Sequence, residues 1–217
     1  MDNRRWITQE NFCFCYCPSF IVHRPLSIQK YKMMKKTFLF VSVCIAFIFM
    51  ACQSDYDKML ARETARGVRN DSLFWTLRLN MSAETFFKEC LELNHQKILL
   101  QAVGESKAVE HPLDKQEMQA PAKMYFFPVF NTQNKVKEMP ITFQYDSYFP
   151  FSTDYNSDKL LPDVLQLMEK WYGKGFIKLE KNPNDPVYAK IDGNRRILIR
   201  KKDDAKVSVL ISDLAQK

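Results

Sequence analysis

The stretch that decides the fold is "VYAKIDGNRRILIRKKDDAKVSVLISDL", which covers residues 187–214. Apolar residues alternate with polar ones in three runs, as in strands that bury one face and expose the other to water. Asp192-Gly193-Asn194 separates the first two runs, and "KKDDA" (201–205) separates the last two. Both separators consist of residues that favour turns, so we expect a three-stranded antiparallel meander here.

Two helices are expected before this meander. The first helix is expected within residues 80–103, where Ser82 is a good cap for its start and apolar residues recur at helical spacing. The face expected to be buried consists of Phe86, Phe87, Cys90, Leu91, Asn94 and Ile98. Residues 157–175 are expected to form the second helix, with Pro162 near its first turn and Gly173 or Gly175 at its C-terminal end. Its expected apolar face consists of Val164, Leu165, Leu167, Met168, Trp171 and Tyr172.

Residues 122–130 and 139–149 alternate with period two and are expected to be strands, with Pro128 and Pro140 at an edge or a bulge. The order of elements is therefore helix, strands, helix, strands. This order predicts an α+β fold with two successive helix-plus-antiparallel-strand units packed as one domain over residues 73–217. A segment of this length is large enough for one substantial core.

Outside this domain, the segment "MMKKTFLFVSVCIAFIFMAC" runs from Met33 to Cys52. Two lysines precede an apolar run that ends in Ala-Cys, which is the layout of a secretory signal. The fourteen residues from Phe38 to Ala51 are fewer than the roughly 20 that span a bilayer. The Ala-Cys ending resembles the lipobox of bacterial lipoproteins. We expect residues 33–51 to be a lipoprotein signal peptide and Cys52 to be acylated, with palmitate among its lipids.

Residues 1–32 precede this signal and contain Cys13, Cys15 and Cys17 at alternate positions. This spacing does not match the paired Cys-x-x-Cys units of zinc sites. We expect residues 1–32 to be an upstream segment from a misassigned start, with a disordered leader as the alternative. The true start would then be Met33 or Met34.

The basic charge of the chain comes mostly from this front part. The whole chain has a net formal charge of +7, of which residues 1–51, with seven Lys or Arg and two Asp or Glu, supply +5. The remainder is close to neutral, so the composition gives no argument for a nucleic-acid partner. After Cys52 only Cys90 remains, and it is expected to be a buried apolar residue rather than a nucleophile.

Residues 52–72 are polar and are expected to form a flexible tether. Asp55 and Asp57 come early in this segment, which resembles the acidic export signal of surface lipoproteins in Bacteroidetes. Asp71-Ser72-Leu73 is similar to the three-residue O-glycosylation pattern of the same bacteria. The resemblance implies an outer-membrane location with surface exposure, a periplasm-facing anchor being the alternative, and it makes Ser72 a glycosylation candidate.

Several blocks of the domain resemble uncharacterised lipoproteins of Bacteroidetes. They are "LRLNMSAETFFKECLELN" (77–94), "EMPITFQYDSYFP" (138–150), "KWYGKGF" (170–176) and "DGNRRILI" (192–199). The resemblance implies an envelope lipoprotein and brings no known activity. The "MSAETF" start (81–86) is also similar to β-lactamase-inhibitor-like modules, a likeness at the level of the fold.

The sequence offers no catalytic set that we can name. His95 and His111 are the histidines after Cys52, and Glu92 with His95 lacks the second pair that a helix-borne metal site needs. There is no glycine-rich phosphate loop and no nucleophile elbow. We expect no catalytic residue, no metal and no cofactor, although sequence leaves enzymatic activity open.

Two features are candidates for binding. Aromatic side chains gather in "DSYFPFSTDYN" (146–156), which is expected to be a loop that exposes Tyr148, Phe149, Phe151 and Tyr155. Residues 174–206 are rich in Lys and Arg, and Arg196, Arg200 and Lys190 are expected to share the wet face of the sheet. Such a face suits an anionic glycan.

Three hypotheses about function remain. The first is a lipid-anchored, non-enzymatic module that binds a glycan, a peptide or another envelope protein. The second is an envelope hydrolase, acting on glycans, whose carboxylates the sequence does not identify. The third is a structural or inhibitory subunit of an envelope complex, which would show a large exposed apolar patch.

Overall fold

The C-terminal meander is confirmed in the computed structural model, which describes residues 54–102, 108–150, 153–179 and 186–216. Strands β7 (Val187–Asp192), β8 (Arg195–Lys201) and β9 (Lys206–Asp213) pair antiparallel in sequence order. Their alternating residues are buried as expected, with Ile197, Ile199 and Val209 fully inaccessible. The turn between β7 and β8 contains Gly193, whose φ is +61°.

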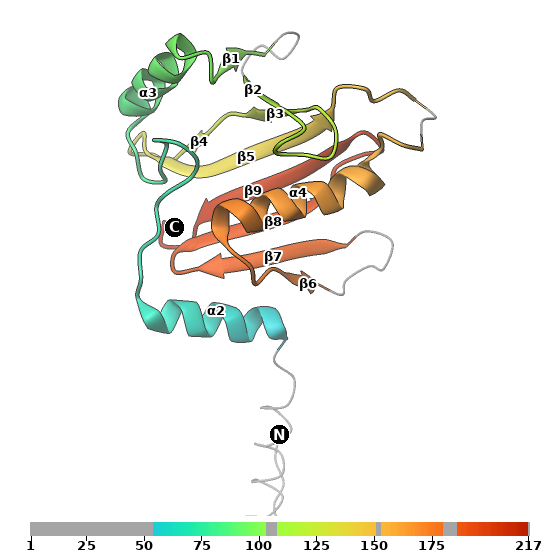
Figure 1. The fold of residues 1–217 in the computed structure, drawn as a ribbon. Helices are drawn as coiled ribbons and strands as arrows, with labels where there is room; N and C mark the ends of the chain where they lie inside the picture. The colour runs from blue at the N-terminus through green and yellow to red at the C-terminus, as the bar shows by residue number, and fades with distance from the viewer. Residues whose placement is uncertain (1–53, 103–107, 151–152, 180–185, 217) are drawn as a thin grey trace, which may run out of the picture. The chain divides into compact units, whose positions relative to one another are not determined.

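These strands belong to one nine-stranded antiparallel sheet (Figure 1). The other strands are β1 (Leu100–Gln101), β2 (Val109–Leu113), β3 (Ala122–Phe126), β4 (Val129–Phe130), β5 (Val136–Tyr145) and β6 (Ile177–Leu179). The strand order is β1-β2-β3-β5-β9-β8-β7-β6, and β4 pairs with β5 beyond the end of β3. The two halves of the chain therefore contribute contiguous halves of the sheet, which meet at β5 and β9, and the α+β class is confirmed.

Pro140 lies inside β5 rather than at its end. It falls between the residues of β5 that pair with β3 and those that pair with β4, and it pairs with Leu210 of β9 on the other side. A proline lacks the N–H that a continuous ladder requires, so this break lets β5 include one.

Helix α4 (Ser157–Tyr172) covers one face of the sheet, over β5, β8 and β9. Asn156 caps its start, with its side-chain oxygen accepting from the backbone N–H groups of Asp158 and Lys159, and Gly173 caps its end. Pro162 is the sixth residue of the helix rather than part of its first turn. The expected apolar face is largely confirmed, because Val164, Leu167, Met168 and Tyr172 are buried while Leu165 and Trp171 are half-buried.

Helix α3 (Ala83–His95) begins after Ser82, whose side chain accepts from the Thr85 backbone N–H at 3.1 Å, as expected. Its buried face differs from the expected one. Phe86 and Leu93 are buried, whereas Phe87 and Leu91 are 49% and 57% exposed. Ile98 follows the end of the helix. The reason is that α3 packs near the edge of the sheet, where only a narrow stripe of the helix is covered.

Residues 55–66 correct the expectation of a flexible tether over 52–72. They form α2 (Asp55–Arg66), which Ser54 caps at its start and Gly67 at its end. Met59, with Tyr56 and Leu60, packs on Ala189 and Ile191 of β7. These β7 residues point away from the α4 side of the sheet, so α2 and α4 cover opposite faces. The compact unit therefore includes α2 and does not begin at residue 73.

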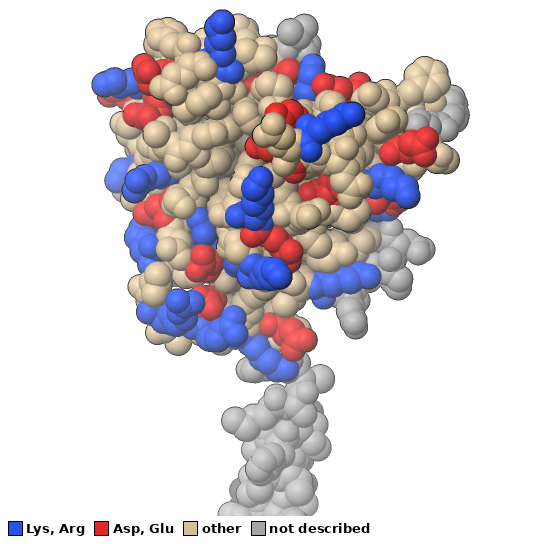
Figure 2. Space-filling model, in the orientation of Figure 1, with Lys and Arg blue, Asp and Glu red and all other residues tan. Residues whose placement is uncertain are grey.

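The sheet brings distant elements to opposite ends of this unit. Helix α2 lies along the β6–β7 end, while α3 lies near β1 at the other end (Figure 1). Lys and Arg are interspersed with Asp and Glu over the face shown in Figure 2. No strongly single-signed field arises on that face.

Candidate ligand-binding site

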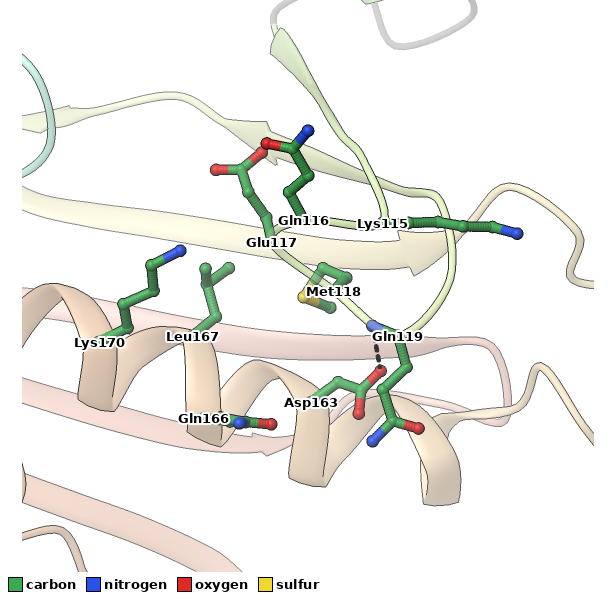
Figure 3. Close-up of a pocket in the computed structure, with 9 residues that line it drawn as sticks. All are labelled: Lys115, Gln116, Glu117, Met118, Gln119, Asp163, Gln166, Leu167 and Lys170. Atoms are coloured by element: carbon green, nitrogen blue, oxygen red, sulfur yellow. Dashed lines mark hydrogen bonds between the residues drawn. The ribbon is translucent and has the colours of Figure 1, made fainter.

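A cavity that is partly open to solvent lies between α4 and the segment that follows β2 (Figure 3). Its volume is about 490 Å³, within the range of small-molecule sites. Three amides, two carboxylates, two ammonium groups and two apolar side chains line it: Lys115, Gln116, Glu117, Met118, Gln119, Asp163, Gln166, Leu167 and Lys170. A lining this polar suits a ligand that forms many hydrogen bonds.

Asp163 is the buried carboxylate of this pocket and is 4% exposed. The Tyr145 hydroxyl donates to its Oδ2 at 2.5 Å, and the Gln119 backbone N–H donates to the same atom at 3.3 Å. Burial raises the pKa of Tyr145 above its ordinary value, and the hydrogen bond to Asp163 raises it further. Tyr145 therefore remains a protonated donor, which holds the carboxylate in one position.

The opposite wall is a short, ordered turn. The Asp114 carboxylate accepts from the Gln116 backbone N–H at 2.7 Å, and the Asp114 carbonyl accepts from the N–H groups of Glu117 and Met118. Met118 is only 5% exposed and packs in the main core. This turn and the buried Met118 fix the direction in which Gln116 and Glu117 face the pocket.

Glu117 connects the pocket to a histidine and an exposed aromatic ring. His111 Nε2 lies 3.9 Å from Glu117 Oε2, while His111 Nδ1 donates to the Ile98 carbonyl at 2.7 Å. The Trp75 ring packs edge-on against the His111 ring, with 4.7 Å between the ring centroids, and Trp75 is 39% exposed. The pocket thus has an aromatic neighbour just beyond its Glu117 side.

Lys170 stands in the last turn of α4, and its side chain extends toward Glu117 across the pocket in Figure 3. Asp163 lies seven residues earlier on the same helix, which corresponds to about 10 Å along the helix axis. Gln166 and Leu167 line the helix between them. The pocket therefore has a buried acceptor at one end and one cation and one anion at the other.

The expected aromatic binding loop is only partly formed. Phe149 is 69% exposed, and Tyr148 is half-buried. Tyr155 packs edge-on against Tyr145 at 5.8 Å and joins the core, which corrects its expected exposure. The ring of Tyr145 sits on the sheet below it, so core packing determines where Tyr155 points. Phe151 lies outside the described residues.

The expected basic face is also divided. Arg196 and Arg200 share one sheet face, where Arg196 Nε donates to Ser212 Oγ at 3.1 Å and Arg200 is exposed. Lys190 points to the other face, which corrects its expected place beside them. Its Nζ donates to the Tyr172, Gly173 and Lys174 carbonyls at 2.5–2.9 Å. Lys190 therefore satisfies the C-terminal carbonyls of α4 instead of facing a ligand.

Ser72 is exposed but lies in a folded segment rather than in a tether. Its Oγ and its carbonyl both accept from Arg195 Nη1, at 3.0 and 2.6 Å. The flanking residues are also held, because Asp71 pairs with Arg69 and Leu73 is buried. Glycosylation of Ser72 stays a prediction. Cys52 lies outside the described residues.

Cys90 is a free, half-buried thiol in α3. Burial, with the nearby Glu89 carboxylate, raises its pKa to about 12. A thiol with this pKa remains protonated at neutral pH and is a poor nucleophile. This agrees with the packing role expected from the sequence.

Exposed apolar side chains gather where α3 meets β4. Phe87 and Leu91 lie one turn apart on α3. The centroid of the Phe87 ring lies 6.3 Å from that of Phe127 and 6.0 Å from that of Phe130. Val129, which precedes Phe130 in β4, is 45% exposed. A surface of this kind is what the third hypothesis, a structural or inhibitory subunit, predicts.

Sequence reasoning missed the pocket and Asp163. One signal was present: Asp163 stands among Leu160, Val164 and Leu167 on the apolar face of α4. Because carboxylates are rarely buried without partners, an acid at such a position indicates a specific hydrogen-bond network. The second wall, residues 115–119, carries no comparable signal, because its contact with α4 joins segments more than 40 residues apart.

The site and the fold together define an α+β protein with a single antiparallel sheet and a polar pocket. Within the described ranges, no cluster of three or more His, Cys, Asp or Glu has the geometry to hold a metal ion. Among these same residues, no helix is long and apolar enough to cross a membrane. No family model, no curated protein and no solved structure matches the chain.

Proposed function

We propose that this protein is a lipid-anchored lipoprotein of the cell envelope whose folded unit is a non-enzymatic binding module. The signal-like segment before Cys52 supports the anchor, and the acidic residues Asp55 and Asp57 after it support surface exposure at the outer membrane of a Bacteroidetes-type cell. Helix α2 begins three residues after Cys52, so the folded unit would stand close to the membrane.

The polar pocket between α4 and residues 115–119 is the observation that carries the binding role. Asp163, its buried carboxylate, is already held by Tyr145 and by a backbone N–H. A carboxylate with fixed donors is a positioned hydrogen-bond acceptor, which suits recognition of a ligand more than transfer of a proton.

The anchor is tested by the intact mass of the full chain expressed in a Bacteroidetes host and extracted from membranes. We expect a mature N-terminus at a diacylated or triacylated Cys52, and loss of the lipid in Cys52→Ala. Cys90→Ala is the matched control and should keep the lipid. A chain that retains residue 1 and carries no lipid would overturn the anchor.

The binding role is tested by two-dimensional NMR of the extracted full chain with a hydrolysate of the host envelope. We expect shifts concentrated on the amide groups of Gln116, Gln119 and Gln166. Gln133, an exposed glutamine in a turn outside the pocket, should not shift. Unchanged pocket resonances would contradict the binding module.

One observation favours the hydrolase alternative. Glu117 and Asp163 line the same pocket, and glycosidases use two carboxylates that face each other across a sugar. This alternative predicts release of reducing ends from envelope glycans, abolished in Glu117→Gln. The binding hypothesis predicts no product from either protein.

A further inference from the structure

The chemistry of the pocket lining restricts what it can bind. Two ammonium groups and two carboxylates give the nine lining residues no net formal charge. Each of the three glutamines offers both a donor and an acceptor. We propose that the pocket takes a neutral saccharide of one or two rings, an inference that rests on the binding function proposed above.

The buried end of the pocket offers an acceptor for hydroxyl donors. Among the described residues, both hydrogen bonds to the Asp163 carboxylate arrive at Oδ2. A carboxylate has about four acceptor positions, so capacity remains for ligand hydroxyls. The side-chain amide of Gln119 lies beside Asp163 in Figure 3 and supplies a donor next to this acceptor. A sugar hydroxyl donates one hydrogen bond and accepts others, so it matches this pairing.

The other end of the pocket also has an acceptor and a donor, here a carboxylate and an ammonium group. Glu117 and Lys170 extend from opposite walls of the pocket (Figure 3). Adjacent hydroxyls of a sugar ring can donate to the carboxylate while accepting from the ammonium group. About 10 Å of helix separates this pair from Asp163, so a ligand that reaches both ends has the length of more than one small polar group.

Apolar contact for the C–H faces of a sugar is limited within the lining itself, because Leu167 and Met118 are only 1% and 5% exposed. Trp75, reached from Glu117 through His111, places an exposed ring beyond the pocket. Apolar contact combined with oriented polar groups is the general composition of small-molecule sites.

A charged ligand fits this lining less well. An anionic sugar that spans the pocket would meet Asp163 at one end and Glu117 with Lys170 at the other, and an amino sugar would meet Lys170 as well as the two carboxylates. Either charge therefore finds a like-charged group along its length. Like charges that approach in a partly enclosed pocket repel strongly, which gives the site a means of selecting uncharged ligands.

Isothermal titration calorimetry of the detergent-extracted full chain tests the proposal. The neutral probes are maltose, cellobiose, lactose and N,N′-diacetylchitobiose, while digalacturonate, glucosamine dimer and trialanine are the charged and peptide probes. We expect at least one neutral disaccharide to bind, with at least ten-fold weaker binding of its charged counterparts. Gln166→Ala and Glu117→Gln should each weaken that binding about ten-fold or more, and the exposed Gln133→Ala should leave it unchanged.

No binding of any neutral disaccharide, or binding that Gln166→Ala and Glu117→Gln leave intact, would overturn the proposal. Tighter binding of trialanine or digalacturonate that still depends on Gln166 would also overturn it. That last result would nevertheless leave the binding module standing, because the pocket would then hold another class of ligand. Failure of the envelope-hydrolysate experiment, by contrast, would remove the binding module itself.

Discussion

At the scale of single residues, the hydrogen bond between Tyr145 and Asp163 links the core to the pocket. Tyr145→Phe removes one donor from a buried carboxylate, so we expect a loss of about 1–3 kcal/mol in the free energy of unfolding. Urea unfolding measures this loss. Asp163→Asn combined with Tyr145→Phe should cost less than the sum of the single changes, because the two groups interact directly.

Tyr155→Phe is the control for this prediction. Its ring packs on Tyr145, but its hydroxyl has no hydrogen bond among the residues that the structure describes. We expect its effect to stay within about 0.5 kcal/mol. A Tyr145→Phe variant as stable as Tyr155→Phe would show that the bond does not stabilise the fold.

Gly193 is the second residue on which the fold depends. Its φ of +61° favours glycine, and a Cβ at this position would meet the Val68 carbonyl oxygen at 2.2 Å. Gly193→Ala should therefore destabilise the protein by more than the roughly 1 kcal/mol of backbone strain alone, because the backbone at Val68 must also move. Thermal unfolding measures the effect. Gly67→Ala is the control, because Gly67 has the same φ of +61° but open space around its Cβ position, so it reports the backbone strain alone.

At the scale of elements, α2 shows how a few long-range contacts determine whether a polar segment folds. Met59 is buried against β7 although most of α2 is exposed. Met59→Ala should cost about 2 kcal/mol and should lower the hydrogen-exchange protection of α2 more than that of β8 or β9. Lys58→Ala, an exposed neighbour, should change neither. Equal loss of protection throughout the sheet would contradict the local role of this contact.

The elements that sequence predicted are those whose pattern is contained in one segment. Alternation over 187–213 indicated β7, β8 and β9, and the spacing from Val164 to Tyr172 indicated α4. Strands β1 and β6 are two and three residues long, too short for an alternation to be recognised. Helix α2 has a sequence typical of a linker, because its apolar contact lies more than 120 residues away, on β7.

The predictions for the site also succeeded where the signal was local and failed where it depended on distant elements. Phe149 is exposed in the loop where aromatic residues were expected, since a short irregular segment after a strand tends to be exposed. Tyr155 and Lys190 were misplaced because their directions depend on Tyr145 and on the end of α4, which lie in other elements. The pocket requires residues 115–119 to pack on α4, and no local pattern contains that contact.

At the scale of the whole molecule, one polar network joins the first described segment to the C-terminal strand. Asp213 is fully buried, and its carboxylate accepts from Arg69, Asn194, Gln216 and the Ala215 backbone N–H at 2.9–3.1 Å. Burial alone would raise the pKa of Asp213. The hydrogen bonds, with the Arg69 charge, outweigh that effect and lower the pKa below its ordinary value.

Glu63 of α2 shows the same balance. Burial favours a higher pKa, but hydrogen bonds from the Gly193 backbone N–H, Arg62 and Arg66 outweigh it, so the pKa of Glu63 is also lowered. A carboxyl whose pKa is lower in the folded state stabilises that state fully above its unfolded pKa. This contribution is lost as the pH falls through the lower, folded pKa.

The folded unit should therefore lose stability in acid at the contacts that join α2 and the segment after it to the C-terminal strands. We expect these two carboxyls to contribute fully above about pH 5, and their contribution to decline as the pH falls below about 4, near the ordinary pKa of carboxyls. Urea unfolding at intervals from pH 3 to pH 7 measures the slope. Asp213→Asn removes a titrating group and should flatten this slope even if it lowers stability at every pH. Asp146→Asn, at an exposed site, should keep the slope of the unaltered protein. An unchanged slope in Asp213→Asn would show that this network does not govern acid unfolding, and that the acid-sensitive carboxyls lie elsewhere in the sheet.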